Sequence, residues 1–162
     1  MTITEKIIEQ LEGVGIQTDF CNGSHTLDAT VDETRVVCEL SALGSLGCAF
    51  EHLTVESSKL ADATGERVQE IGAALSKQLT YLLEPIAVIE ADAEEGMVQL
   101  RSEPPHRVED SRSYYELLVR RGGELRLQRF CKTNGVARRA VPASVTREVF
   151  LRLVGDLVAA VE

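Results

Sequence analysis

The chain has 162 residues, of which 44% are hydrophobic and 27% are charged, and its formal net charge is −9. These values are typical of one globular domain and argue against intrinsic disorder. The first 16 residues mix isoleucines with Glu, Lys and Gln, which predicts neither a signal peptide nor a membrane anchor and favours the cytoplasm. We expect the four cysteines to be reduced thiols: Cys21, Cys38, Cys48 and Cys131.

The first half of the chain predicts a helix, three strands and a second helix. Ile3, Ile7 and Leu11 recur at helical spacing before Gly13, so the first helix is short. Residues 24–55 alternate apolar and polar side chains around two turns, which predicts three antiparallel strands. An apolar stripe from residue 57 or 58 to about 83 then predicts one long helix, followed by a proline.

The second half predicts two hairpins and a last helix. Residues 86–91 and 97–101 form the first hairpin, and a polar loop with two prolines extends to residue 113. Residues 114–120 and 124–132 form the second hairpin. A three-residue loop there pairs Val119 with Leu125 and Leu117 with Leu127 on one face, whereas a two-residue loop would mix the faces. The last helix follows Pro142, and Ser144 can cap it.

This order of elements predicts the α+β class. We expect a single domain over residues 1–162, with two layers, in the order α-βββ-α-ββββ-α. The sheet is mainly antiparallel and the helices lie on one of its faces.

No motif in the chain specifies catalysis, and we expect neither a metal nor another cofactor. Cys21, His25, Cys48 and His52 are the ligand types of a zinc site. In an extended strand, however, residues 48 and 52 would lie about 13 Å apart, so core thiols and surface imidazoles are favoured. The glycines near residues 13 and 45 lack the spacing of a phosphate-binding loop and predict turns.

Charge is divided unevenly along the chain, with a net −13 in residues 1–100 and a net +5 in residues 101–139. The last hairpin can therefore offer a basic surface that binds carboxylates or phosphates. Pairing of these arginines with acidic neighbours is an equally open interpretation. The overall negative charge and the few aromatic residues disfavour nucleic acid. The candidate binding residues are Arg120, Arg126, Arg129, Arg138 and Arg139.

Three stretches, in an acidic chain of this size and order of elements, carry a resemblance to a known family. They are HTLDATVDETRVVCEL, LLEPIAVIEADAEEGMVQLRSEPP and SVTREVFLRLVGDLVAAVE. Together they resemble the type III secretion chaperones and their relatives of similar fold. The resemblance implies a homodimeric, non-enzymatic protein whose sheet and helices hold an extended peptide of a partner. The additional hairpin at residues 114–132 departs from the shorter strand set of that family.

We therefore expect a cytoplasmic protein-binding or chaperone-like module that holds a protein or peptide partner. The alternative is a protein or enzyme that binds a small anionic ligand between the long helix and the sheet, beside the arginine-rich hairpin. We also expect a homodimer, formed through one of the two long helices or a sheet edge, because the last helix has a broad apolar face. The candidate interface residues are Val149, Phe150, Leu153 and Leu157.

Overall fold

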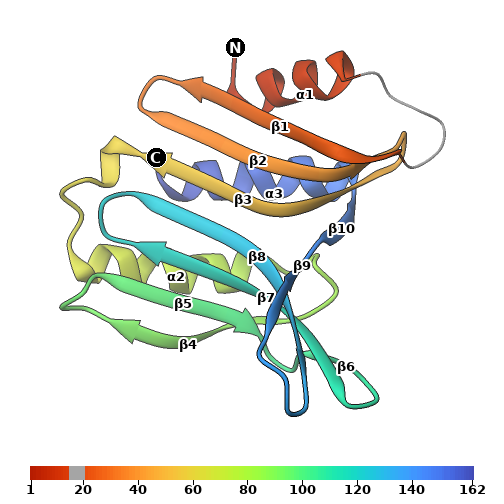
Figure 1. The fold of residues 1–162 in the computed structure, drawn as a ribbon. Helices are drawn as coiled ribbons and strands as arrows, with labels where there is room; N and C mark the ends of the chain where they lie inside the picture. The colour runs from red at the N-terminus through yellow and green to blue at the C-terminus, as the bar shows by residue number, and fades with distance from the viewer. Residues whose placement is uncertain (15–20) are drawn as a thin grey trace.

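The computed structural model describes residues 1–14 and 21–162, and in the first strand it describes side chains from residue 24 onward. Within these residues the chain forms three α-helices and a ten-stranded antiparallel sheet, which confirms the predicted α+β class (Figure 1). The elements are α1 (Ile3–Gly13), β1 (Cys21–Val31), β2 (Thr34–Leu43), β3 (Gly47–Ser57), α2 (Gly65–Gln78), β4 (Ile86–Asp92), β5 (Met97–Ser102), β6 (His106–Val108), β7 (Ser111–Arg120), β8 (Glu124–Thr133), β9 (Arg139–Val141), β10 (Ala143–Thr146) and α3 (Arg147–Ala160).

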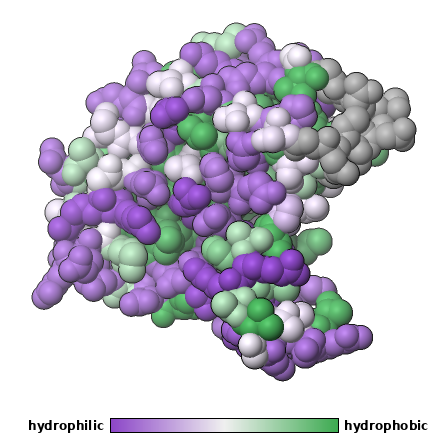
Figure 2. Space-filling view, viewed as in Figure 1, coloured by the Kyte–Doolittle hydropathy of each residue, from purple (hydrophilic) through white to green (hydrophobic). Residues whose placement is uncertain are grey.

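All three helices cover one face of the sheet. Helix α1 packs against β1, α3 against β2, β3 and β10, and α2 against β4, β5 and β7. Apolar side chains from the helices and from every second strand position fill the space between the layers. The other face of the sheet, which we call the open face, is mostly hydrophilic (Figure 2).

The predicted long helix is wrong at both ends. Residues 58–60 form one 3₁₀ turn, and α2 begins only after Thr64, whose hydroxyl accepts a hydrogen bond from the amide of Arg67 at 3.1 Å. Thr64 and Gly65 interrupt the helix because the threonine caps a new start. A side chain at Gly65 would also overlap the carbonyl group of Ala93. Helix α2 ends at Gln78, and residues 79–85 form a linker to β4.

The second hairpin has the predicted three-residue loop and register. Val119 lies opposite Leu125, Leu117 opposite Leu127, and Arg120 opposite Glu124. The apolar pairs face the helices, because alternating side chains point to opposite faces of a strand.

Other predictions for the second half are corrected by the structure. The predicted polar loop to residue 113 contains β6 and the start of β7. Residues 139–141, for which the sequence predicted no element, form β9, and residues 143–146, where it predicted the cap and start of the last helix, form β10. Ser144 lies within β10, and Thr146 caps α3 by accepting a hydrogen bond from the amide of Val149 at 3.1 Å.

The apolar face of α3 is covered within one chain. Phe150, Leu153 and Leu157 are fully buried in the core, and Val149 is partly buried. None of the large apolar side chains of α3 is exposed in the described part of the chain. Within one chain this face is thus covered by the sheet and by α1 and α2.

The sheet divides into a fork between β3 and β8. These strands pair only along residues 53–56 and 124–127. Beyond this point β8 pairs with β9, and β3 pairs with β10. Pro142 stands between β9 and β10, where the chain leaves one strand of the fork for the other. Residues 106–115 and 129–141 form the side of the fork that projects from the sheet, which we call the arm (Figure 1).

Candidate functional site

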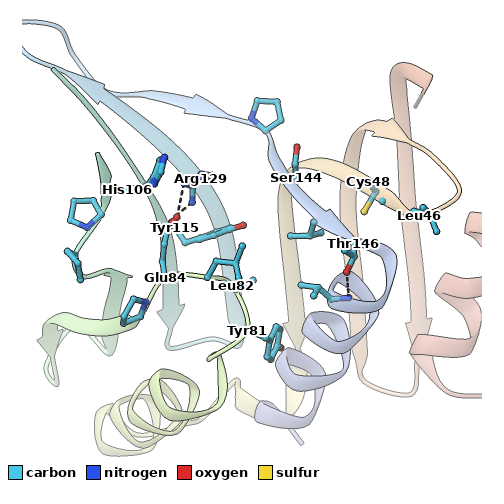
Figure 3. A pocket seen from close by; sticks show the side chains of 18 residues that line it. Leu46, Cys48, Tyr81, Leu82, Glu84, His106, Tyr115, Arg129, Ser144 and Thr146 are labelled. Atoms are coloured by element: carbon cyan, nitrogen blue, oxygen red, sulfur yellow. Dashed lines mark hydrogen bonds and ion pairs between the residues drawn. The ribbon is translucent and has the colours of Figure 1, made fainter. Parts of the chain in front are cut away.

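A groove of about 1060 Å³ lies where the fork opens, between the arm and the rest of the molecule. One wall comes from the β2–β3 turn, β10 and the first turn of α3. The other comes from the linker at residues 81–85, the start of β6, and Tyr115 and Arg129 of the arm. Figure 3 shows Ser144 and Thr146 on β10 facing this space from one side and His106 from the other.

The groove has rigid and largely apolar walls. All four prolines of the chain line it: Pro85, Pro104, Pro105 and Pro142. Proline fixes the backbone angle φ and has no amide hydrogen to donate. These segments therefore hold their shape and present few hydrogen-bond donors to an occupant.

An ion pair neutralises the charge within the groove. The guanidinium of Arg129 donates to both carboxylate oxygens of Glu84, at 2.9 and 3.2 Å, and both side chains are largely buried (Figure 3). The same guanidinium lies 4.6 Å from the centre of the Tyr115 ring. Since its hydrogen-bonding fork is already used by a carboxylate, Arg129 offers little to a second anion.

Tyr81 fixes the linker to α3. Its hydroxyl donates to Asp156 at 2.6 Å, and the guanidinium of Arg152 lies 4.2 Å from the ring centre. Burial and the neighbouring carboxylate raise the pKa of the Tyr81 hydroxyl, which therefore stays neutral. The linker is thus held in place beside the groove.

Cys48 lines the groove, where its surroundings do not activate the thiol. It is buried, and burial raises the pKa of its thiol to about 11, so the thiol stays protonated near neutral pH. Within the described residues no three Cys, His, Asp or Glu side chains form a group that could hold a metal ion. The side chain of Cys21, one of the four candidate ligands, lies outside the described part. Gly15, one of the two glycines predicted to form a turn near residue 13, also lies outside it.

Two leucines at the groove are unusually exposed. Leu46 is 83% exposed and Leu83 is 98% exposed, the highest values among the large apolar residues of the described chain. Leu83 also has a φ of +65°, in the left-handed region that disfavours side chains with a β-carbon. Exposed apolar surface and a strained backbone both cost stability, and both occur here at the groove.

The five predicted binding arginines do not form one surface. Arg129 lies in the groove. Arg139 lies opposite Cys131 in the sheet, and Cys131 is two residues after Arg129 on β8. Alternate residues of a strand point to the same face, so Arg139 lies on the groove side of the arm, as Arg129 does. Arg120 and Arg126 lie on the open face, and Arg138 packs there as well.

Internal pairing accounts for the arginines around Glu116 on the open face. Glu116 is only 5% exposed and forms ion pairs with Arg101, at 3.3 Å, and with Arg138. The guanidinium of Arg138 lies 3.9 Å from the centre of the Phe130 ring, and that of Arg101 lies 4.6 Å from the Tyr114 ring. These contacts attach the loop before β9 to the sheet and stabilise the arm.

Sequence reasoning missed most of the groove, including both exposed leucines and the tyrosines at positions 81 and 115. The sequence placed Leu83 only at the approximate end of the predicted long helix. The available signal was Pro85, because a proline disfavours helical backbone at the residue before it.

Comparisons with protein-family models, curated proteins and solved structures found no match to this chain. None of the helices in the described residues is both long and apolar enough to span a membrane.

Proposed function

We propose that this protein holds an extended segment of a partner protein in the groove, without covalent chemistry. The observation that carries the proposal is the coincidence of two exposed leucines with an unpaired strand edge. An extended segment can satisfy both, because its backbone pairs with the edge while alternate side chains contact the apolar walls.

The outer edge of β1 is covered by polar side chains of α1. The ammonium group of Lys6 donates to the carbonyl of Thr30 at 2.7 Å. The side-chain amide of Gln10 donates to the carbonyl of Asp28 at 2.7 Å and accepts from its amide at 2.9 Å. A partner strand therefore finds the outward backbone groups of Asp28 and the carbonyl of Thr30 already bonded.

The opposite edge, β4, is protected in a different way. Its register shifts between Val88 and Glu90, which marks a bulge, and acidic side chains continue into its turn. Bulges and charges are common means of preventing strand addition. Val88 and Ile89 are exposed on this strand, but its irregular backbone makes it a poor template.

Strand β10 has no such protection. It pairs with β3 on one side, and no other described strand pairs with it. The amide of Arg147 donates to the carbonyl of Leu46 at 3.0 Å. Amides alternate in direction along a strand, so those of Ser144 and Thr146 point away from β3. They are directed toward the groove, where a partner backbone can accept their hydrogen bonds.

The alternative of a small anionic ligand has less support. It required several arginines converging on a pocket, but Arg120 and Arg126 lie on the open face. Arg129 does line the groove, where Glu84 already neutralises it. An apolar segment with an extended backbone fits these walls better than an isolated anion.

We further propose that the protein acts in the cytoplasm. The cysteines with described side chains, Cys38, Cys48 and Cys131, are free thiols, as in a reducing compartment. The resemblance to type III secretion chaperones implies an extended peptide of a partner protein. It therefore supports the proposal that the groove holds such a segment.

A displayed library of random twelve-residue peptides tests the proposal. The wild-type chain should select peptides with alternating apolar residues. The double variant Leu46→Ser/Leu83→Ser should lose them, and Val88→Ser/Ile89→Ser on β4 is the matched control that should keep them. Selection of no peptides, or equal binding to the Leu46→Ser/Leu83→Ser variant, would contradict the proposal.

A further inference from the structure

Arg139 lies on the groove side of the arm, beyond the end of the apolar walls. In the pairing of β8 with β9, Val141 is opposite Arg129 and Arg139 is opposite Cys131. Opposed residues of an antiparallel pair point to the same face, so Arg139 projects to the face that carries Arg129. The residue is exposed, and it does not itself line the groove.

The charge of Arg139 is not used within the described chain. Each of the other two arginines in residues 129–141 has a carboxylate partner: Arg129 pairs with Glu84, and Arg138 pairs with Glu116 on the open face. Arg139 makes no ion pair with any described residue. Lys132 has no carboxylate partner either, but it lies on the open face and donates to the carbonyls of Thr133 and Val136. Among residues 129–141, Arg139 is therefore the described cation that remains available on the groove side.

We infer that Arg139 binds a carboxylate of the partner segment, so that the protein selects an apolar stretch flanked by Asp or Glu. This inference rests on the proposed function, because it takes the segment to lie along β10. The groove supplies apolar contacts and edge hydrogen bonds, which any apolar strand could use. Arg139 supplies the charge that distinguishes one such strand from another and sets its direction.

The spacing between the two contacts follows from the chain. Arg139 and Ser144 are five residues apart, which is at most about 16 Å of extended backbone at 3.3 Å per residue. The carboxylate should therefore lie within about five residues of the part of the segment that pairs with β10. A single exposed guanidinium next to apolar walls suits one carboxylate, whereas phosphate backbones are bound by several cations at once.

Two synthetic peptides test the inference on the full chain. Both peptides are ten residues long, have blocked termini and alternate Val and Thr over the first seven positions. The last three residues of one peptide include two Glu, and the other peptide has Gln at those two positions. Fluorescence anisotropy should show about two- to fivefold tighter binding of the Glu peptide, as expected for an exposed charge pair. Arg139→Gln should remove this preference, and Arg139→Glu should reverse it.

Arg120→Gln is the matched control, because Arg120 lies on the open face and should leave the preference unchanged. Equal urea midpoints for the variants show that folding is unaffected. If both peptides bind equally to the wild type but fail to bind Leu46→Ser/Leu83→Ser, the inference is overturned and the proposed function stands. If neither peptide binds the wild type, the proposed function fails, and the inference fails with it.

Discussion

Replacing Leu83 with glycine should stabilise the protein, although it removes a large apolar side chain. The side chain is 98% exposed, so its loss removes almost no buried contact. Its φ of +65° costs about 1–2 kcal/mol for a residue with a β-carbon. Glycine avoids this strain but adds about 0.5–1 kcal/mol of chain entropy to the unfolded state. The net gain in the free energy of unfolding should be about 0.5–1 kcal/mol.

Leu83→Ala is the control for this prediction, because alanine retains the strain while it shortens the side chain. Its stability should lie within about 0.5 kcal/mol of the wild type. Urea unfolding at unchanged slope should give a higher midpoint for Leu83→Gly than for Leu83→Ala. Both variants should bind groove peptides more weakly, since both lose the apolar contact. A glycine variant less stable than the alanine variant would refute the claim that Leu83 stores strain for binding.

Three other predictions concern the sheet. Glu116→Gln should lower the free energy of unfolding by about 1–2 kcal/mol in urea titrations, because two arginines lose their carboxylate partner. Gly123→Ala should lower the free energy of unfolding by more than about 2 kcal/mol in the same assay, because its φ is +95° and a β-carbon would overlap the carbonyl of Ser57. Gly122 has a φ of +99° but lies in open space, so Gly122→Ala should lower it by only about 1 kcal/mol. The wild type should lose folding stability as the pH is lowered from 7 to 5, and His52→Gln should reduce this loss. Urea midpoints at several pH values measure it.

The sign of the His52 effect follows from its surroundings. Burial and then the nearby Arg126 lower the pKa of His52, while Glu39 and Glu51 act in the opposite direction. The unfolded chain therefore binds the proton more readily, and this contribution to stability is lost as the pH falls below about 6.5. An unchanged pH profile in the variant would contradict this account. Equal costs for Gly122→Ala and Gly123→Ala, or a neutral Glu116→Gln, would contradict the other two.

The predictable part of the fold lies where local pattern and tertiary contacts agree. The second hairpin is the clearest case, because only one loop length places Leu117, Val119, Leu125 and Leu127 on the same face. Its register could therefore be read from side chains alone. The prediction for α2 was wrong at both ends because the apolar stripe continues through Thr64 and the linker. The pattern therefore indicated neither the cap at Thr64 nor the end of the helix at Gln78.

The fork could not be predicted from the sequence. Strands β9 and β10 have three and four residues and flank a proline, so they have little tendency to form alone. Strand β10 exists because it pairs with β3, almost a hundred residues earlier in the chain. The groove depends on this pairing. Its residues come from six separate segments, and no spacing in the sequence indicates that Pro85, Pro104, Pro105 and Pro142 line one groove.

Residue-resolved amide hydrogen exchange on the full chain, with and without the Glu-ended Val/Thr peptide, tests the central claim most directly. The amides of Ser144 and Thr146 point away from β3, so they should exchange rapidly in the free protein and become protected when the peptide binds. Amides of β4 and of the outer edge of β1 should not change. Unchanged exchange at Ser144 and Thr146 in the presence of saturating peptide, or protection confined to β4 or the open face, would contradict partner binding in the groove.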